Sequence, residues 1–340
     1  MVKIRSMVFA VILIGLSYTA CNVSVEQWPL RDSYIAVTDN EAAIVILDSQ
    51  GKVVKRIYPL VDSMEEIHSP ILLGKSEKVA FLSRNKPSAP FYIYAVDRNG
   101  KNLVAAEIPN ARYLDGSPVS NELLFSSAGT GNRLTIVDFS TNPPAYHRVF
   151  NKTQIYCPAV EATVTLTQAF AGAYSPDGEK IAFITLGTYP APIPSDPPIE
   201  RVDIGIVNRD GSGYKLLTGN YKESLPFTSW VKLLWTFDGK YVLAITGRET
   251  ISSIYVFQMT GKGAGVLTTR STPYLHSYSY VTVSPTGDTL LFGTTPGEAD
   301  LFVADFYNNS TNFKLAAKIL GRLSNKSTYA EPDWGPGGEK

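Results

Sequence analysis

The chain has 340 residues, of which 44% are hydrophobic and 18% are charged, and its formal net charge is zero. This composition is that of a globular protein with a substantial core, and it lacks the basic excess on which nucleic-acid binding depends. A chain with 26 glycines, 22 prolines and 19 tyrosines, and without a long helical pattern, favours an all-β fold.

The first twenty residues have the features of an export signal. Lys3 and Arg5 precede an apolar run over residues 7–16, which is too short to cross a bilayer but matches the apolar region of a signal peptide. The sequence Ser-Tyr-Thr-Ala-Cys then ends at Cys21. It resembles a bacterial lipobox, in which the cysteine is acylated and becomes the new N-terminus. Tyr18 departs from that pattern, because an aliphatic residue is usual at this position.

We therefore expect residues 1–20 to be a signal peptide and residues 21–32 to be a linker that Cys21 anchors to a membrane. Ordinary secretion with cleavage after Ala20 is the alternative, and both place the protein outside the cytoplasm. Cys157 is the only other cysteine. Acylation of Cys21 would leave it no disulfide partner, so the fold must depend on its core.

A two-part motif recurs over residues 33–340. Its first part is a tight turn followed by a β-run, clearest in the Ser-Pro-Asp-Gly sequence of residues 174–185. Its second part is a strand that leads into an Asp-Gly or Asn-Gly hairpin, clearest over residues 203–218. The β-runs of the first part begin at Ile35, Val79, Leu123, Ile181, Val242 and Leu290, at intervals of 44 to 61 residues. Four short strands in each repeat of this length are typical of propeller blades.

The two ends of the chain carry complementary halves of this motif. The C-terminal sequence from Pro332 contains the turn but stops before the β-run, and the missing run is found at residues 34–39. We therefore predict a six-bladed β-propeller with four antiparallel strands per blade. Its C-terminal blade is completed by the N-terminal strand, which leaves no open sheet edge.

The Ser-Pro-Asp-Gly and Asp-Gly-Ser-Gly units resemble the WD-like repeats of TolB-type propellers. The resemblance covers residues 33–340 and implies the propeller fold, on which many unrelated activities occur. TolB also has an α/β domain before its propeller, and the short segment of residues 21–32 has no room for one.

Strand order places the long connections on one face of such a propeller. The tight turns would share the opposite face, while long loops are expected at residues 151–170, 186–201, 220–230 and 270–280. Loops gathered on a rigid scaffold often bind ligands, and the innermost strands begin at this face, around the mouth of the central channel. The candidate ligand-binding residues there are His68, Arg112, Tyr113, Trp230, Lys232, His276, Tyr278, Tyr280 and Glu331. Packing between blades or structural salt bridges would explain these residues equally well.

Three functions remain open from the sequence, one of which is a purely sensory or structural repeat protein with no ligand of its own. The first is a non-catalytic binding or scaffold protein at the cell envelope, which recognises a protein or glycan through aromatic loops and needs no cofactor. The alternative is a polysaccharide lyase or hydrolase with its site at the channel mouth. His68 and His276 would face that site, but two histidines are few for a metal centre. We expect a monomer that contacts a membrane through Cys21 and does not bind nucleic acid.

Overall fold

The computed structural model describes the chain from Ser33 to Pro336 with gaps. The residues described are 33–39, 43–58, 64, 66–74, 77–86, 88–106, 108–127, 134–149, 154–158, 160–191, 196–219, 231–236, 238–248, 251–260, 264–268, 280–283, 289–293, 301–305, 319–322 and 329–336. They form strands and turns, and no helix long and apolar enough to span a membrane occurs among them. The predicted signal peptide, Cys21 and the linker of residues 21–32 lie outside these residues.

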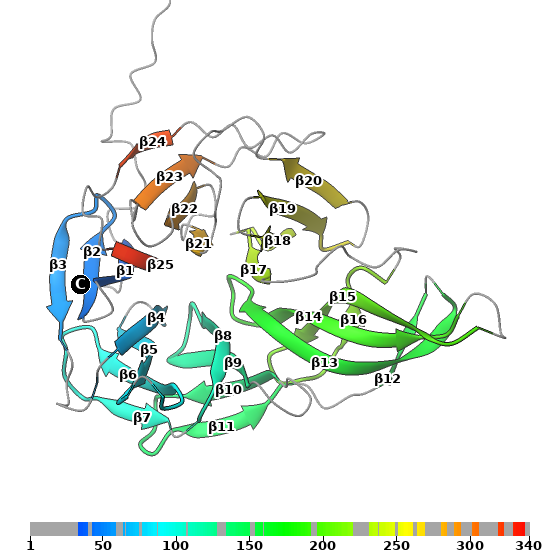
Figure 1. Cartoon of the computed structure of the whole chain (residues 1–340), viewed down its shortest axis with the longest axis horizontal. Helices are drawn as coiled ribbons and strands as arrows, with labels where there is room; N and C mark the ends of the chain where they lie inside the picture. The colour runs from blue at the N-terminus through cyan, green and yellow to red at the C-terminus, as the bar shows by residue number, and fades with distance from the viewer. Residues whose placement is uncertain are drawn as a thin grey trace, which may run out of the picture.

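The strands form six antiparallel sheets, which we number as blades (Figure 1). Blade 1 contains β4 (Glu66–Leu73), β5 (Lys78–Arg84), β6 (Tyr92–Asp97) and β7 (Val104–Ala106). Blade 2 contains β8 (Ala111–Gly116), β9 (Glu122–Ser127), β10 (Leu134–Asp138) and β11 (Ala145–Arg148). Blade 3 contains β12 (Gln154–Cys157), β13 (Ala162–Tyr174), β14 (Lys180–Tyr189), β15 (Ile199–Asn208) and β16 (Lys215–Leu216).

The remaining three blades complete the ring. Blade 4 contains β17 (Val231–Trp235), β18 (Tyr241–Arg248), β19 (Ile251–Gln258) and β20 (Ala264–Thr268). Blade 5 contains β21 (Tyr280–Val283), β22 (Thr289–Gly293), β23 (Leu301–Asp305) and β24 (Ile319–Arg322). Blade 6 contains β25 (Tyr329–Pro336), β1 (Ser33–Asp39), β2 (Ala43–Asp48) and β3 (Val53–Ile57). The innermost strands contact one another in the cyclic order β25, β4, β8, β13, β17, β21 and again β25, so the six blades surround a common axis.

The predicted closure of the ring is confirmed by blade 6. Strand β25 from the C-terminus pairs with β1 from the N-terminus, and its register runs from Ser33 opposite Pro336 to Asp39 opposite Tyr329. On its other side β1 pairs with β2. Both ends of the described chain are therefore fixed within one sheet, which removes the exposed edge that an open ring would leave.

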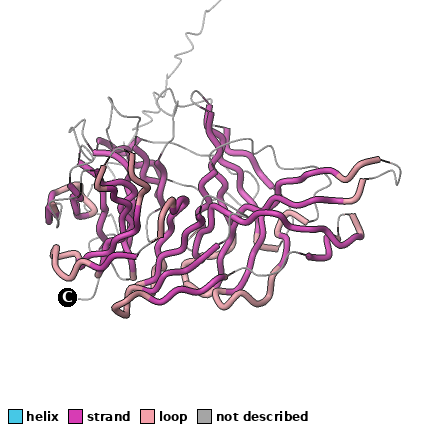
Figure 2. Tube along the Cα trace, turned by 60° about the horizontal axis from the view of Figure 1, so that its bottom comes forward, coloured by secondary structure: helices cyan, strands magenta, loops and turns pink. Residues whose placement is uncertain are grey.

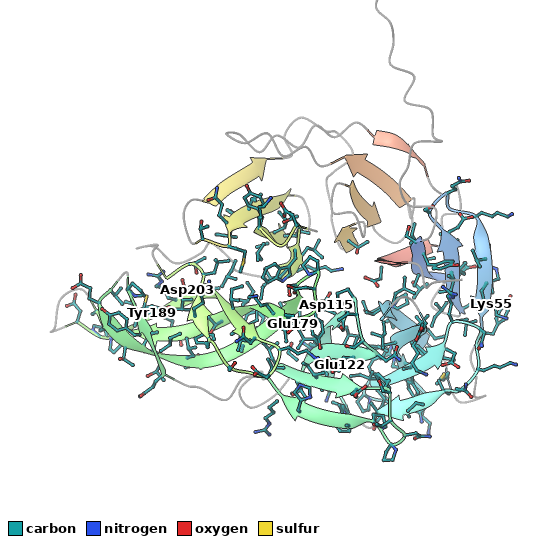
Figure 3. All side chains as sticks on the ribbon, turned by 180° about the vertical axis from the view of Figure 1, so that it is seen from behind. Lys55, Asp115, Glu122, Glu179, Tyr189 and Asp203 are labelled. Carbon is teal, nitrogen blue, oxygen red and sulfur yellow. The ribbon has the colours of Figure 1, made fainter. Side chains whose placement is uncertain are left out.

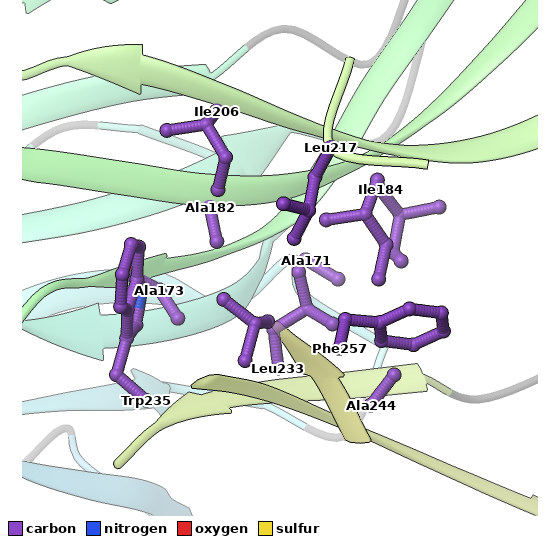
Figure 4. Packing of buried hydrophobic residues seen from close by; sticks show 12 residues of the cluster. Ala171, Ala173, Ala182, Ile184, Ile206, Leu217, Leu233, Trp235, Ala244 and Phe257 are labelled. Carbon is purple, nitrogen blue, oxygen red and sulfur yellow. The ribbon is translucent and has the colours of Figure 1, made fainter. Parts of the chain in front are cut away.

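Apolar clusters fill the interfaces between blades, which explains why the strands are nearly continuous hydrophobic runs. Between blades 3 and 4, Ala173, Ile184 and Ile206 pack against Leu233 and Trp235 (Figure 4). Equivalent clusters lie between blades 1 and 2, between blades 2 and 3, and between blades 6 and 1. A blade sheet is thus covered on both faces, and the alternation expected of a half-exposed strand is lost.

The repeated sequence motif forms the tight turns of the blades. In the turn after β13, the Gly178 N–H donates to the Ser175 carbonyl (2.8 Å), and Gly178 has a φ of 72°, which favours glycine. The Asp177 carboxylate accepts a hydrogen bond from the Glu179 N–H (3.0 Å). The Arg209 N–H, in the hairpin after β15, donates to the Glu179 carbonyl (2.9 Å). The two kinds of turn therefore lie together on one face, here called the turn face, and the other connections lie on the opposite loop face.

An ion pair between the buried Glu122 and the half-exposed Arg209 joins blades 2 and 3 close to the turn face. The Arg209 guanidinium donates to both carboxylate oxygens of Glu122, through Nε at 2.8 Å to Oε2 and through a second nitrogen to Oε1 (Figure 3). The Tyr174 hydroxyl also donates to Glu122 (3.3 Å). Burial, followed by the charge of Glu122, raises the pKa of Tyr174, while the Glu122 hydrogen bond raises the pKa of Arg209. The blades are therefore joined by polar contacts as well as by apolar packing.

Blade 3 departs from the predicted four-strand pattern, because its strands continue beyond the ring. Residues 151–170 and 186–201 were expected to be loops, but the structure places β12, most of β13 and the ends of β14 and β15 there. We call the projecting part, made of residues 154–158, 160–168, 185–189 and 199–203, the arm (Figure 2). It folds because one of its faces is apolar: Cys157, Val164, Leu166 and Tyr189 form a separate buried cluster.

The arm also buries a charged pair. Arg201 and Asp203 are 3% and 0% exposed, with 2.9 Å between the guanidinium and the carboxylate. The Tyr189 hydroxyl and the Thr218 hydroxyl both donate to Asp203, the latter at 2.7 Å (Figure 3). Burial is the main cause that raises the pKa of Tyr189, and the Asp203 charge adds to it. The carboxylate thus has three partners that offset the cost of removing it from water.

Candidate functional site

The candidate site is the mouth of the central channel on the loop face, where the innermost strands begin. In three blades this position carries the same backbone irregularity: Ser69, Tyr113 and Ala171 have φ values of 48°, 52° and 51°. In each case the register against the neighbouring strand shifts at this point. A non-glycine residue in the left-handed conformation costs free energy. Its recurrence at the same place in three blades therefore marks a regular bulge at the loop-face end of the innermost strands.

Two predicted site residues lie on this bulge in blade 2. The side chain of Arg112 is exposed, and the half-buried Tyr113 ring lies 5.7 Å from the Phe170 ring of blade 3. In blade 4, β17 pairs with β18 in regular register, and the half-buried Lys232 lies near its start. The structure therefore brings a guanidinium, an ammonium and two aromatic rings to neighbouring innermost strands.

His68 has well-defined neighbours at the start of β4 in blade 1. Its Nε2 lies 3.4 Å from the Glu66 carboxylate, and its ring meets the Phe91 ring edge-on at 5.1 Å. The Arg84 guanidinium donates to the same carboxylate (2.8 Å) and covers Phe91 at 4.7 Å. The hydrogen bond from Arg84 is the largest influence that lowers the pKa of Glu66. His68 therefore belongs to a polar and aromatic cluster at the loop face of blade 1.

The structure describes only two of the other predicted site residues. Tyr280 begins β21 and Glu331 lies in β25, so both occupy innermost strands as expected. Trp230, His276 and Tyr278 lie outside the residues that the structure describes. Within the described ranges, no three His, Cys, Asp or Glu side chains come close enough together to hold a metal ion.

The structure adds two carboxylates that sequence reasoning missed. The Asp115 carboxylate accepts a hydrogen bond from the Tyr174 N–H of the next blade (2.7 Å), and the Asp333 carboxylate accepts one from the Leu72 N–H (2.8 Å). Figure 3 shows Asp115 near the centre of the ring. Both residues come from innermost strands, β8 and β25. Each replaces the apolar residue that blades 1, 3 and 4 have two positions before the turn, and that replacement was the signal available in the sequence.

Electrostatics connect these carboxylates to Lys232. Burial raises the pKa of Asp115 to about 7, and the negative charge of Asp333 contributes to the rise. The hydrogen bond from Tyr174 and the positive charge of Lys232 act in the opposite direction. Charged groups of both signs, from two other innermost strands, therefore act on Asp115.

Comparison with known proteins identifies the fold. No protein-family model matches this sequence, and no curated protein sequence matches it. Among solved structures, TolB from Acinetobacter baumannii is similar over 90% of this chain and 67% of its own, with a TM-score of 0.54 and 18% identity. The fold is that of a TolB-like β-propeller.

Two other solved structures also match this chain over most of its length. A chain of the nidogen/laminin complex is similar over 89% of this chain and 98% of its own, with a TM-score of 0.57 and 10% identity. Hydrazine synthase from Kuenenia stuttgartiensis is similar over 89% of this chain and 46% of its own, with a TM-score of 0.57 and 13% identity. Identities this low establish the fold alone, so the function must be argued from the residues of this chain.

Proposed function

We propose that this protein is an exported, non-catalytic binding or scaffold propeller, anchored to a membrane of the cell envelope by an acylated Cys21. It recognises a protein or glycan of the envelope through the loop face around the channel mouth. The observation that carries this proposal is the combination of the exposed Arg112, the half-buried Lys232 and the Tyr113–Phe170 ring pair on neighbouring innermost strands. These groups stand on strands of a closed ring, and rigid elements hold binding groups in fixed positions.

The chemistry of the mouth suits a ligand with both polar and flat apolar parts. Aromatic side chains supply contact area at small entropic cost, and the arginine can bind a carboxylate through two hydrogen bonds. No observation among the described residues specifically favours the lyase or hydrolase alternative, since His68 contacts Glu66 and Phe91.

Export and anchoring are tested separately from binding. The basic residues, the apolar run of residues 7–16 and the small residues before Cys21 support them. In a bacterial host, the wild-type chain should fractionate with membranes, and its N-terminal peptide should carry the mass of a lipid-modified cysteine. Cys21→Ser should release the protein from membranes. A wild-type chain that keeps residues 1–20 and remains in the cytoplasm would refute this part of the proposal.

Binding is tested by recovery of partners from an envelope extract. The double variant Arg112→Ala, Lys232→Ala should lose a specific protein or glycan that the wild type recovers. Lys101→Ala is the matched control, because Lys101 is an exposed basic residue in a turn-face hairpin. Equal recovery by the wild type and the double variant would show that the channel mouth is not the binding site.

A further inference from the structure

The arm presents an exposed sheet face that is separate from the channel mouth. Strand pairing places Gln154, Thr165, Thr188 and Glu200 directly opposite one another, in a row across β12, β13, β14 and β15. The next row outward contains Tyr156 opposite Thr163. Side chains that are directly paired share one face of a sheet, so these six residues form a continuous surface, here called the arm face.

The arm face is open and almost neutral. Gln154, Thr163, Thr165 and Glu200 are exposed, and Thr188 is half-buried. Tyr156 is 58% exposed. Glu200 carries the only charge in the two rows, while the threonines and Gln154 offer hydroxyl and amide groups that both donate and accept hydrogen bonds.

The opposite side of the arm is buried, which leaves the polar residues of the arm on the exposed side. Val164 and Leu166, which alternate with the threonines of β13, are buried with Cys157 and Tyr189 in the core of the arm. That core, together with the Arg201–Asp203 pair, holds the four strands in position. The row of four side chains spans about 14 Å, because neighbouring strands are about 4.8 Å apart.

We infer that the arm face binds a neutral, extended polysaccharide. Sugar rings present hydroxyl groups at their edges and an apolar C–H face, so threonine and glutamine hydrogen-bond the edges while Tyr156 stacks on a ring. A stable protein interface, including one with a second copy of this chain, requires roughly 1,200 Å² or more of buried surface and a central apolar patch. Among these six residues, only Tyr156 supplies a large apolar surface.

This site does not depend on the channel mouth, because it uses different residues of a different part of blade 3. It is tested with the full chain and three probes: cellohexaose, maltohexaose and hexagalacturonate. Cellohexaose is neutral and extended, maltohexaose is neutral and curved, and hexagalacturonate is acidic. We expect calorimetric binding of cellohexaose, weaker binding of maltohexaose, and no binding of hexagalacturonate at the arm.

Variants of the arm face locate the binding. Tyr156→Ala should weaken cellohexaose binding about tenfold by removing the stacking surface. Thr165→Val and Thr188→Val keep side-chain size but remove a hydroxyl, and together they should weaken binding by a similar factor. Tyr146→Ala is the matched control, because Tyr146 is an exposed tyrosine on β11, outside the arm. Far-UV circular dichroism and thermal unfolding of each variant show whether the arm remains folded.

The results of these measurements show whether a polysaccharide or a protein binds to the arm face. Loss of binding in the arm variants, with Tyr146→Ala unchanged, supports the inference. Absence of cellohexaose binding by the wild-type chain overturns it, as does binding that the arm variants leave intact. A concentration-dependent dimer that Tyr156→Ala dissociates, without glycan binding, would show that the arm face is a protein interface instead. The Arg112→Ala, Lys232→Ala variant should bind cellohexaose normally, which keeps this test distinct from that of the channel mouth.

Discussion

Replacement of Asp115 by asparagine should change how the stability of the propeller depends on pH. In the folded protein the pKa of Asp115 is about 7, whereas that of an aspartate in an unfolded chain is about 3.9. Between these two values the folded state holds a proton that the unfolded state has lost. The contribution of Asp115 to stability is therefore fully present below about pH 4 and is lost as the pH rises through 7.

The structure gives the size and the sign of the difference. A rise of the pKa from about 3.9 to about 7 corresponds to about 4 kcal/mol, which is an upper value because Asp115 is only half-buried and solvent screens its charge. The asparagine side chain would keep a carbonyl oxygen that accepts the hydrogen bond from the Tyr174 N–H (2.7 Å in the wild type). Asp115→Asn should therefore be more stable than the wild type at pH 8, and the two should converge near pH 4.

Chemical denaturation at pH 4, 5, 6, 7 and 8 measures this difference. Asp177→Asn is the matched control: a hydrogen bond from Ser175 lowers the pKa of Asp177, so the stability difference between this variant and the wild type should stay nearly constant from pH 5 to 8. The stability that Asp177 provides is present above pH 4 and is lost as the pH falls through its lowered folded pKa. Parallel curves for Asp115→Asn and the wild type from pH 5 to 8 would show that Asp115 is charged throughout this range and that folding does not raise its pKa.

Three further predictions concern the packing of the ring and of the arm. Arg209→Ala removes the cation that pairs with Glu122, whose side chain is 4% exposed. Urea unfolding should therefore show a free energy of unfolding lower by about 2 kcal/mol, and a second change, Glu122→Gln, should restore part of it. Because Cys157 is fully buried, a Cys21→Ser chain should not react with a thiol reagent until denaturant is added; immediate reaction would contradict the buried placement. Removal of residues 329–340 deletes β25 and exposes β1, so circular dichroism should show loss of cooperative unfolding; an intact transition would mean that closure contributes little.

The ring could be predicted from the sequence because each blade repeats the same local chemistry. All six expected β-runs, from Ile35 to Leu290, lie in the strand next to the innermost strand of a blade. The half-motif at each end predicted the pairing of β1 with β25. Repetition makes such inferences strong, because a turn that is ambiguous in one blade is supported by its copies in the others.

The arm could not be predicted from the repeat, since it is what blade 3 adds to the repeat. The sequence Ala-Thr-Val-Thr-Leu-Thr-Gln of residues 162–168 alternates polar and apolar residues, which is typical of a half-exposed strand. Inside the ring, strands are covered on both faces and read as continuous apolar runs. The change from one pattern to the other marks the point where β13 leaves the ring.

The two candidate surfaces should differ in how strongly salt concentration affects ligand binding. The channel mouth carries Arg112 and Lys232, whereas the arm face carries a single carboxylate among hydroxyl and amide groups. Salt screens interactions between exposed charges over about 10 Å at 0.1 M, but it affects stacking and neutral hydrogen bonds little. Binding at the mouth should therefore weaken strongly from 50 to 500 mM salt, while cellohexaose binding at the arm should remain nearly constant. A ligand that loses affinity with salt and is unaffected by Tyr156→Ala would be assigned to the mouth, and the converse pattern would assign it to the arm.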